Sequence, residues 1–312
     1  MQKLLLLFLL LNGYVLSAQT LPDINQLLFH DPLKKGPTYM KVVSTSYVVV
    51  ASEERMFLLN ATGQAVDSII VNDFSPSGTL NAMFPMDTTH VFTSTQKHLQ
   101  KWEIQRDRLV LVHTYEIDRA FKKRYGKKDW YILTPYGMLS RKAKGKTDIC
   151  AEGVYTWFAK NGEQSVIKSH ERHCERFSED FPASEAISVY KQQVLLNFPC
   201  CKEVVWMDMK NNSWKTVAFP SLATKGNVEY MLWDRLAYRP YLVKANATES
   251  VIYRLDTEKG AYELMTETMG QVVGIAGGKV LTKMTFSGEE TYYWYFWKKE
   301  TEQQEPTEKR EQ

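Results

Sequence analysis

Side chains that could bind a metal gather in one short segment of the chain. Residues 170–174 read HERHC, and imidazole nitrogen and thiolate sulfur are ligands that zinc prefers. The Cys200-Cys201 pair could supply a further thiolate. The spacing matches no established zinc pattern, and a loop rich in Glu, Arg and His is commonly just solvated. We predict no cofactor here, and a zinc site on His170, His173 and Cys174 is the alternative.

The same cysteines can be read as disulfide partners. The chain has four of them, Cys150, Cys174, Cys200 and Cys201. An even number of cysteines in an exported chain is typical of one or two disulfides. Four cysteines allow three connectivities, and a bond between the adjacent Cys200 and Cys201 would be strained. We therefore predict disulfides that hold long loops, with their pairing left open.

Positive charge is concentrated in one part of the chain. Between Arg119 and Lys146 there are ten Lys and Arg residues and a single acid, Asp129. Such a density could attract an anionic glycan, a lipid headgroup or an acidic protein surface, and the alternative is a solvated loop that keeps the protein soluble. The residues that we predict to bind are Lys122, Lys123, Arg124, Lys127, Lys128, Arg141, Lys142, Lys144 and Lys146.

No established catalytic signature occurs in the sequence. It contains no G-x-S-x-G, H-E-x-x-H, Walker or dinucleotide fingerprint. A metal-dependent hydrolase would need several Asp, Asn, Glu or His side chains that converge on one calcium or zinc ion. The few candidates at the starts of predicted first strands are Asp129, Glu185, Asn227 and Glu229.

The two ends of the chain indicate where the protein works. Lys3 is followed by an unbroken apolar block from Leu4 to Leu11 and a small residue at Ala18, a pattern typical of a secretory signal peptide spanning residues 1–18. The block is too short to span a bilayer, which needs about 20 apolar residues. We predict an exported protein, periplasmic or extracellular and not membrane-spanning. Residues 298–312 carry no apolar side chain and predict a disordered polar tail.

Composition narrows the fold class and the partners. A hydrophobic content of 44% with 39 aromatic residues (17 Tyr, 14 Phe and 8 Trp) allows a large core and favours strands over helices. A net charge of +3 is too small to indicate nucleic acid as a partner. Helical periodicity is nearly absent, and residues 23–29 are the best helical candidate. The rest predicts short strands separated by Gly, Asn, Asp and Pro.

A repeated hairpin sets the architecture. An apolar or aromatic strand, a turn of Asn, Asp, Lys and Gly, and a second strand recur along the chain. The copies are Met56–Val71, Tyr155–Ser169, Val205–Phe219 and Ile252–Met265, with a looser copy at Leu99–Tyr115. With two strands upstream of each copy, four-stranded units begin near Tyr39, Asn81, Trp130, Glu185, Asn227 and Gln271. These spacings are close to the ~40–50 residues of a propeller blade.

We therefore predict an all-β fold over residues 19–297, a six-bladed β-propeller with an N-terminal strand closing the last blade. The last unit lacks a fourth strand of its own, and residues 26–30 could supply it. A β-sandwich or two small β domains are the alternatives, but these would rarely repeat a hairpin at a near-constant interval. The third-strand aromatics Trp102, Trp157, Trp206 and Tyr253 are expected to pack between blades.

The blade pattern from Tyr39 to Trp297, together with the leader, resembles the TolB-like six-bladed propellers of secreted bacterial proteins. The resemblance rests on architecture, and a propeller fold by itself hosts both enzymes and binding modules. In a four-stranded blade, the second-to-third-strand loops share one face with the connections between blades. That face should carry both the basic residues and the cysteines. We predict a non-enzymatic module that binds a protein or anionic glycan partner there, and a lactonase-like hydrolase is the alternative.

Overall fold

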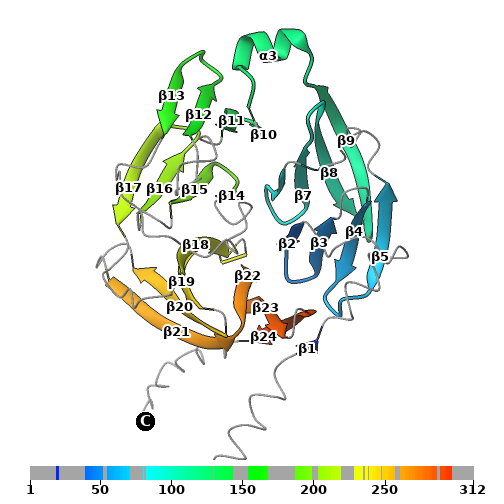
Figure 1. The fold of residues 1–312 in the computed structure, drawn as a ribbon, viewed down its shortest axis with the longest axis vertical. Helices are drawn as coiled ribbons and strands as arrows, with labels where there is room; N and C mark the ends of the chain where they lie inside the picture. The colour runs from blue at the N-terminus through cyan, green and yellow to red at the C-terminus, as the bar shows by residue number, and fades with distance from the viewer. Residues whose placement is uncertain are drawn as a thin grey trace, which may run out of the picture.

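The computed structural model describes most of the chain between its two ends. The described residues are 19–20, 39–51, 55–70, 80, 82–128, 130–142, 154–167, 187–198, 203–218, 228–234, 236–237, 239–246, 248–256, 261–286 and 289–296. They form six separate four-stranded antiparallel sheets, arranged as the blades of a ring (Figure 1). The predicted six-bladed β-propeller is confirmed.

Blades 1 to 5 each use four consecutive strands, from the axis outward. Blade 1 consists of β2 (Tyr39–Val42), β3 (Tyr47–Ala51), β4 (Arg55–Asn60) and β5 (Ala65–Ile70). Blade 2 consists of β6 (Ala82–Pro85), β7 (His90–Ser94), β8 (His98–Gln105) and β9 (Arg108–Glu116). Blade 3 consists of β10 (Trp130–Thr134), β11 (Gly137–Lys142), β12 (Val154–Ala159) and β13 (Gln164–Ile167).

The second half of the chain repeats the plan. Blade 4 consists of β14 (Ile187–Tyr190), β15 (Gln193–Phe198), β16 (Glu203–Asp208) and β17 (Ser213–Ala218). Blade 5 consists of β18 (Val228–Asp234), β19 (Arg239–Ala245), β20 (Glu249–Asp256) and β21 (Ala261–Met269). Blade 6 consists of β22 (Gln271–Ala276), β23 (Lys279–Phe286) and β24 (Glu289–Phe296), completed by β1 (Gln19–Thr20). The six first strands begin within two residues of the predicted starts.

The ring closes through a strand from the N-terminal part of the chain, as predicted, but a different segment supplies it. Gln19 and Thr20 pair antiparallel with Trp294 and Tyr293 of β24. The fourth strand was expected from residues 26–30, and that assignment is wrong. Residues 26–30 lie outside the described residues, as does the helical candidate over residues 23–29. Pairing with β1 covers part of the edge that β24 would otherwise expose.

The predicted hairpins are confirmed by their turns. The Oδ1 atom of Asn60 accepts hydrogen bonds from the backbone N–H groups of Thr62 (3.0 Å) and Gln64 (2.9 Å), and Gly63 has a positive φ of 80°. Asn212 in the blade 4 turn also has a positive φ, 50°. Asn and Gly tolerate this conformation at low cost, which is why they mark these turns, whereas the blade 2 turn places Arg106 and Asp107 at positive φ.

The ring is not evenly built, because blade 3 is set back from the axis. Its first strand β10 packs against β7 and β8 of blade 2, and the N–H of Tyr131 donates to the Oγ of Ser94 (3.3 Å). The first strands of blades 2 and 4, β6 and β14, contact one another directly. The N–H of Lys191, after β14, donates to the carbonyl of Met86, after β6 (3.0 Å). Neighbouring blades 2 to 4 share one apolar cluster, so blade 3 is held between the sheets of blades 2 and 4.

Tyrosine hydroxyls on two first strands link neighbouring blades. The hydroxyl of Tyr39 on β2 donates to the carbonyl of Leu80, just before β6 (2.8 Å), and that of Tyr230 on β18 donates to the carbonyl of Val272 on β22 (2.6 Å). Burial raises the pKa of Tyr39 to about 12, because the ionised phenolate would lose its hydration.

We expect the stability of the protein to fall at alkaline pH partly through Tyr39. Because its folded pKa is raised, the unfolded chain loses this proton first, so stability present below pH ~10 is lost as the pH rises toward 12. The loss is about 2–3 kcal/mol for this one group. Urea unfolding of the parent and of Tyr39→Phe, between pH 9 and pH 12, measures it. The difference in the free energy of unfolding between the parent and Tyr39→Phe should shrink as the pH rises. A difference that stays constant would contradict the raised pKa of Tyr39.

The prediction that the third-strand aromatic side chains pack between blades is confirmed for the most deeply buried of them. Trp157 is fully buried and Trp102 is 6% exposed. Trp206 packs edge-on against Trp233 of blade 5, with ring centroids 5.3 Å apart. Tyr253 packs at the border of the same apolar cluster as Trp206. Large aromatic side chains thus fill the space between sheets, as the pleated surfaces require.

Candidate binding surface and central channel

One helix in the connection between blades 2 and 3 carries much of the predicted basic segment. It is α3 (Arg119–Tyr125), and the sequence analysis missed it because its seven residues show too little apolar periodicity. Its caps could have revealed it. The carboxylate of Asp118 accepts from the N–H of Phe121 (2.7 Å), and Gly126 with a φ of 76° ends the helix. An Asp before and a Gly after a short run of good helix formers is a recognised signature.

Aromatic contacts hold α3 against blade 3. The ring of Phe121 meets the ring of Tyr131 on β10 edge-on, with centroids 5.0 Å apart. The ring of Tyr125 meets Phe158 on β12 in the same manner at 5.1 Å. The hydroxyl of Tyr131 also donates to the carbonyl of Gly126 at the end of the helix. The helix is therefore fixed to the blade by its apolar side, and its charged side faces solvent.

The cations of α3 and the nearby Lys127 form what we call the basic surface, made of Arg119, Lys122, Lys123, Arg124 and Lys127. All five side chains are exposed. The helix has no acidic residue in its first turn, and three of its cations lie in the last turn, where they complement the helix dipole. The result is a dense positive surface displayed from a packed element.

Other predicted basic residues have different surroundings. The Nζ of Lys128 donates to the Oγ1 of Thr156 on β12 (3.0 Å), and Lys128 is only half-exposed. Arg141 is 9% exposed, so it does not extend the basic surface. Lys142 is exposed at the end of β11. Lys144 and Lys146 lie outside the described residues.

Strand register places the two basic segments at the same end of blade 3. Trp130 at the start of β10 pairs with Arg141 near the end of β11. The connection that contains α3 enters β10 at this end, and the loop that follows Lys142 leaves β11 there. Lys142 therefore lies on the same face of the ring as the basic surface.

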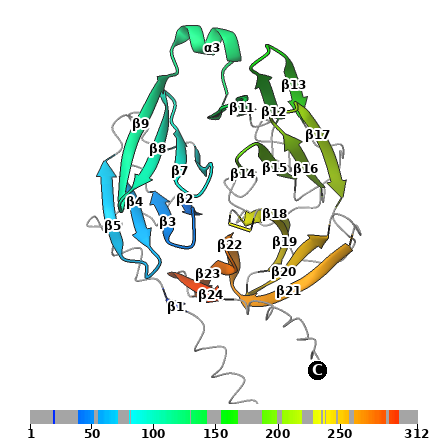
Figure 2. The same ribbon diagram turned by 180° about the vertical axis from the view of Figure 1, so that it is seen from behind.

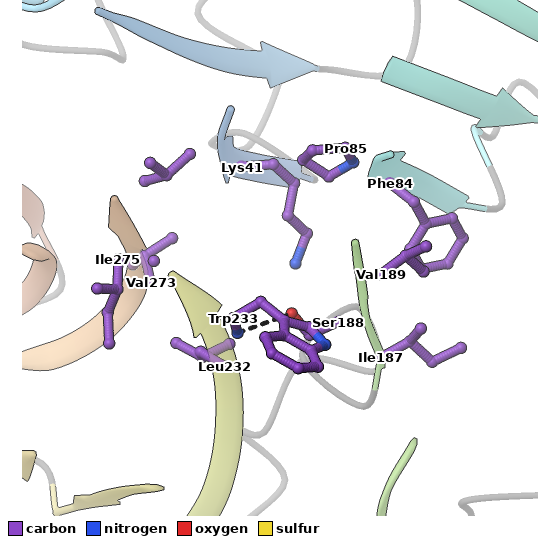
Figure 3. Close-up of a pocket in the computed structure, with 12 residues that line it drawn as sticks. Lys41, Phe84, Pro85, Ile187, Ser188, Val189, Leu232, Trp233, Val273 and Ile275 are labelled. Carbon is purple, nitrogen blue, oxygen red and sulfur yellow. Dashed lines mark hydrogen bonds between the residues drawn. The ribbon is translucent and has the colours of Figure 1, made fainter. Parts of the chain in front are cut away.

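The first strands enclose a narrow central channel. Its lining comes from five of the six, β2, β6, β14, β18 and β22, because β10 is set back (Figure 3). The cavity measures ≈ 20 Å³, room for about one water molecule. Lys41 is the one charged side chain in the lining, and it is 8% exposed. Ser188 adds a hydroxyl, whose oxygen accepts from the N–H of Trp233 (3.2 Å), and the remaining side chains are apolar.

The carboxylates that a hydrolase would need are not among the residues that line this channel. Of the four candidates, Asp129, Glu185 and Asn227 lie outside the described residues. Glu229 lies on β18, and its side chain is not described. Within the described part of the chain, no group of three His, Cys, Asp or Glu side chains is arranged to hold a metal ion.

The predicted zinc ligands and disulfide partners are not tested by the structure. His170, His173 and Cys174 lie outside the described residues, as do Cys150, Cys200 and Cys201. The zinc site and the disulfides therefore stay predictions. The predicted leader and tail also lie outside that part of the chain. Among the described helices, none is long and apolar enough to cross a membrane.

A histidine between two carboxylates occurs on the opposite face, and the sequence analysis did not single it out. The Nδ1 of His90 lies 2.9 Å from the Oδ2 of Asp87, and its Nε2 lies 4.0 Å from the Oε1 of Glu103. Burial raises the pKa of Asp87, but hydrogen bonds from Thr89 and His90 and the nearby imidazole outweigh it, so that this pKa lies below its ordinary value. The carboxylate accepts from the N–H groups of its own turn, which is a turn-stabilising arrangement.

Comparison with known proteins identifies no family and only remote structural neighbours. No protein-family model matches the chain, and no curated protein sequence does. The major Malassezia sympodialis allergen Mala s 1 is 9% identical over 90% of this chain and 96% of its own, with a TM-score of 0.49. The WD40 repeats of RRP9 are 8% identical over 90% and 98%, with a TM-score of 0.48.

A third solved structure is a member of the duf4221 family from Bacteroides vulgatus. It is 11% identical over 90% of this chain and 96% of its own, with a TM-score of 0.48. All three similarities are remote, and the propeller assignment rests on the six sheets of the chain itself. The resemblance to TolB-like propellers stays a prediction.

Proposed function

We propose that this protein is an exported, non-enzymatic binding module that engages an anionic protein or glycan through the basic surface on α3. The observation that carries the proposal is the combination of exposed charge and fixed position. Five exposed cations lie within nine residues, four of them on a helix that aromatic contacts hold against blade 3 and the fifth, Lys127, just beyond its end. A cation on a packed element loses less freedom on binding than one on a solvated loop.

The leader and the face of the ring support the same proposal. A periplasmic or extracellular protein meets anionic glycans and acidic protein surfaces, and it has less occasion to meet nucleic acid. Lys142, exposed at the same end of blade 3, adds positive charge to that face. Architecture of the TolB-like kind would provide the rigid ring on which this face is displayed.

The test is the triple reversal Lys122→Glu, Lys123→Glu, Lys127→Glu, assayed on immobilised heparin and on poly-glutamate. Lys128 is left intact because its bond to Thr156 couples it to blade 3. Each lysine near an anionic surface contributes about 1 kcal/mol, so we expect binding to weaken by roughly 100-fold or more. The salt dependence of the remaining binding should also flatten.

A matched control carries the same change of charge elsewhere. Lys160, Lys210 and Arg239 are exposed in turns at the opposite face of the ring, and their reversal to Glu alters the net charge equally. This control should lose far less binding than the α3 variant. Equal losses in the two triple variants would show that net charge alone governs retention, and the proposal would fail.

The hydrolase alternative receives no comparable support. The described lining of the channel holds an ammonium group, Lys41, where that alternative needs converging carboxylates. Stoichiometric calcium or zinc in the purified protein would nevertheless overturn the binding-module proposal in favour of the enzyme.

A further inference from the structure

The outermost strand of blade 2 exposes an unusual apolar edge. β9 is nine residues long and ends the order β6-β7-β8-β9, so one of its backbone edges has no partner among the described strands. Four of its apolar or aromatic side chains are exposed by 38% to 47%: Val110, Leu111, Val112 and Tyr115. From Leu109 to Tyr115 the strand contains no Asp, Glu, Lys or Arg.

Such an edge is normally protected. Proteins block edge strands with charged side chains, Pro or short length, because an open edge can pair with another chain. β21, the equally long outer strand of blade 5, carries Glu263 and Glu267. The outer strand β13 has only four residues. Among the described outer strands, β9 is thus long and also lacks charged side chains along most of its edge.

Hydrogen bonds near the two ends of β9 identify which of its backbone groups face outward. The N–H of Leu109 donates to the Oδ2 of Asp67 on blade 1 (2.7 Å), so it points away from β8. Beyond the other end of the strand, the N–H of Ile117 donates to the carbonyl of Lys97 and points inward (2.6 Å). A bulge lies opposite Lys101 and Trp102. Strand alternation on either side of that bulge turns the N–H groups of Leu111 and Thr114 outward.

The open stretch leads from blade 1 toward the basic surface. β5 of blade 1 lies beside the start of β9, at Leu109, and the chain continues from the other end of β9 into α3 (Figures 1 and 2). An incoming strand would therefore run along residues 110–115 and reach the basic surface where β9 ends. Apolar edge and positive charge together define a partner that is apolar along one part and acidic at one end.

We infer that β9 accepts an extended segment of a partner protein by antiparallel strand addition, with acidic residues before that segment contacting the basic surface. This inference rests on the proposed function and names the class of its partner. Main-chain hydrogen bonds to the edge supply affinity, and the exposed Val and Tyr side chains select apolar residues at alternate positions. Because β9 runs toward α3, the N-terminal end of an antiparallel segment lies at the basic surface.

The probe is the synthetic peptide Asp-Asp-Asp-Thr-Val-Thr-Val-Thr-Val, compared with the same peptide carrying Asn in place of Asp. Binding to the full chain is measured by fluorescence anisotropy. We expect the acidic peptide to bind at least tenfold more tightly than the neutral one. The triple reversal on α3 should remove that difference and leave the affinity for the neutral peptide unchanged.

Two variants test the strand itself. Thr114→Pro removes an outward N–H, a change that an edge strand tolerates. It should lower the affinity for both peptides at least tenfold. The double variant Val110→Thr, Val112→Thr keeps strand propensity but removes apolar contact with the peptide. It should lower the affinity for both peptides several-fold. Both variants should retain heparin binding and the parent midpoint of urea unfolding to within experimental error. If Thr114→Pro unfolds the protein, the double Thr variant decides alone.

The outcomes separate the two proposals. If the edge variants leave peptide affinity unchanged while the α3 reversal still lowers it, strand addition is overturned and the basic surface stands. If the α3 reversal changes neither heparin nor peptide binding, both proposals fall. Sedimentation of the unliganded protein adds one outcome: a dimer that Thr114→Pro dissociates would assign the edge to a second copy of this chain and overturn the inference.

Discussion

Replacing Asp234 by Ala should destabilise the protein by about 3–5 kcal/mol, although this residue is remote from any proposed binding site. Asp234 ends β18 and is fully buried. Its Oδ1 accepts from the N–H groups of Leu236 (2.9 Å) and Ala237 (3.0 Å) in its own turn. A buried carboxylate with several backbone donors is a strong, charge-assisted arrangement.

The same carboxylate also joins two blades. Its Oδ1 accepts from the N–H of Gly277 (2.8 Å) and its Oδ2 from the N–H of Gly278 (3.4 Å), both in the first turn of blade 6. Gly277 has a φ of 56°, and a Cβ there would lie 2.8 Å from Leu236 and from Thr45 of blade 1. Losing the carboxylate would leave backbone donors from two blades without their acceptor at a point where three blades meet.

Urea unfolding followed by circular dichroism measures the loss, with two comparison variants. Asp234→Asn keeps one acceptor oxygen, so it should lose about half as much stability. Asp208→Ala is the comparison: the half-buried Asp208 accepts from the N–H groups of Lys210 and Asn211 and from the Nε2 of Gln193, and within the described residues all its bonds stay in blade 4. We expect about 1 kcal/mol there. A similar loss for Asp234→Ala and Asp208→Ala would show that the link between blades contributes nothing.

Replacing Trp157 by Ala should cost about 3–5 kcal/mol, because a large buried side chain would leave a cavity. Trp157 lies on β12 and is fully buried. Its indole packs on the bare Cα of Gly137, where a Cβ would stand 2.8 Å from the Cζ2 atom of the ring and 2.3 Å from the carbonyl oxygen of Phe158. Gly137 itself has no side chain that could move into the cavity.

The indole nitrogen makes a second variant informative. Within the described part of the chain, the Nε1 of Trp157 has no hydrogen-bond acceptor. Trp157→Phe therefore loses volume but no hydrogen bond, and should cost less than half as much as Trp157→Ala. Trp214→Ala is the control, since Trp214 is 43% exposed and exposed side chains contribute little. Equal losses for the Phe and Ala variants would contradict the cavity explanation. Circular dichroism avoids the change in Trp fluorescence.

Features carried by local residue types could be read from the sequence. Hairpin turns can be recognised in the sequence because Asn and Gly occupy positions of positive φ, as Gly63 and Asn212 do. Strands can be recognised in the sequence because Val, Tyr and Trp favour pleated, half-buried surfaces. Repetition of these signals placed all six blades, and the density of Lys and Arg marked the segment that contains α3. The short helix was missed, although Asp118 and Gly126 marked its ends.

The tertiary structure decided everything that depends on contacts between distant segments. Which segment closes blade 6 follows from the pairing of Gln19 with Trp294, and no local pattern in the sequence encodes that partner. Packing also buries Arg141 on β11, whereas the cations of the basic surface stay exposed. It set β10 back from the axis and left β9 with an open edge beside α3. Local propensity fixes a turn or a strand within a few residues, whereas long-range packing energies choose which of those elements meet.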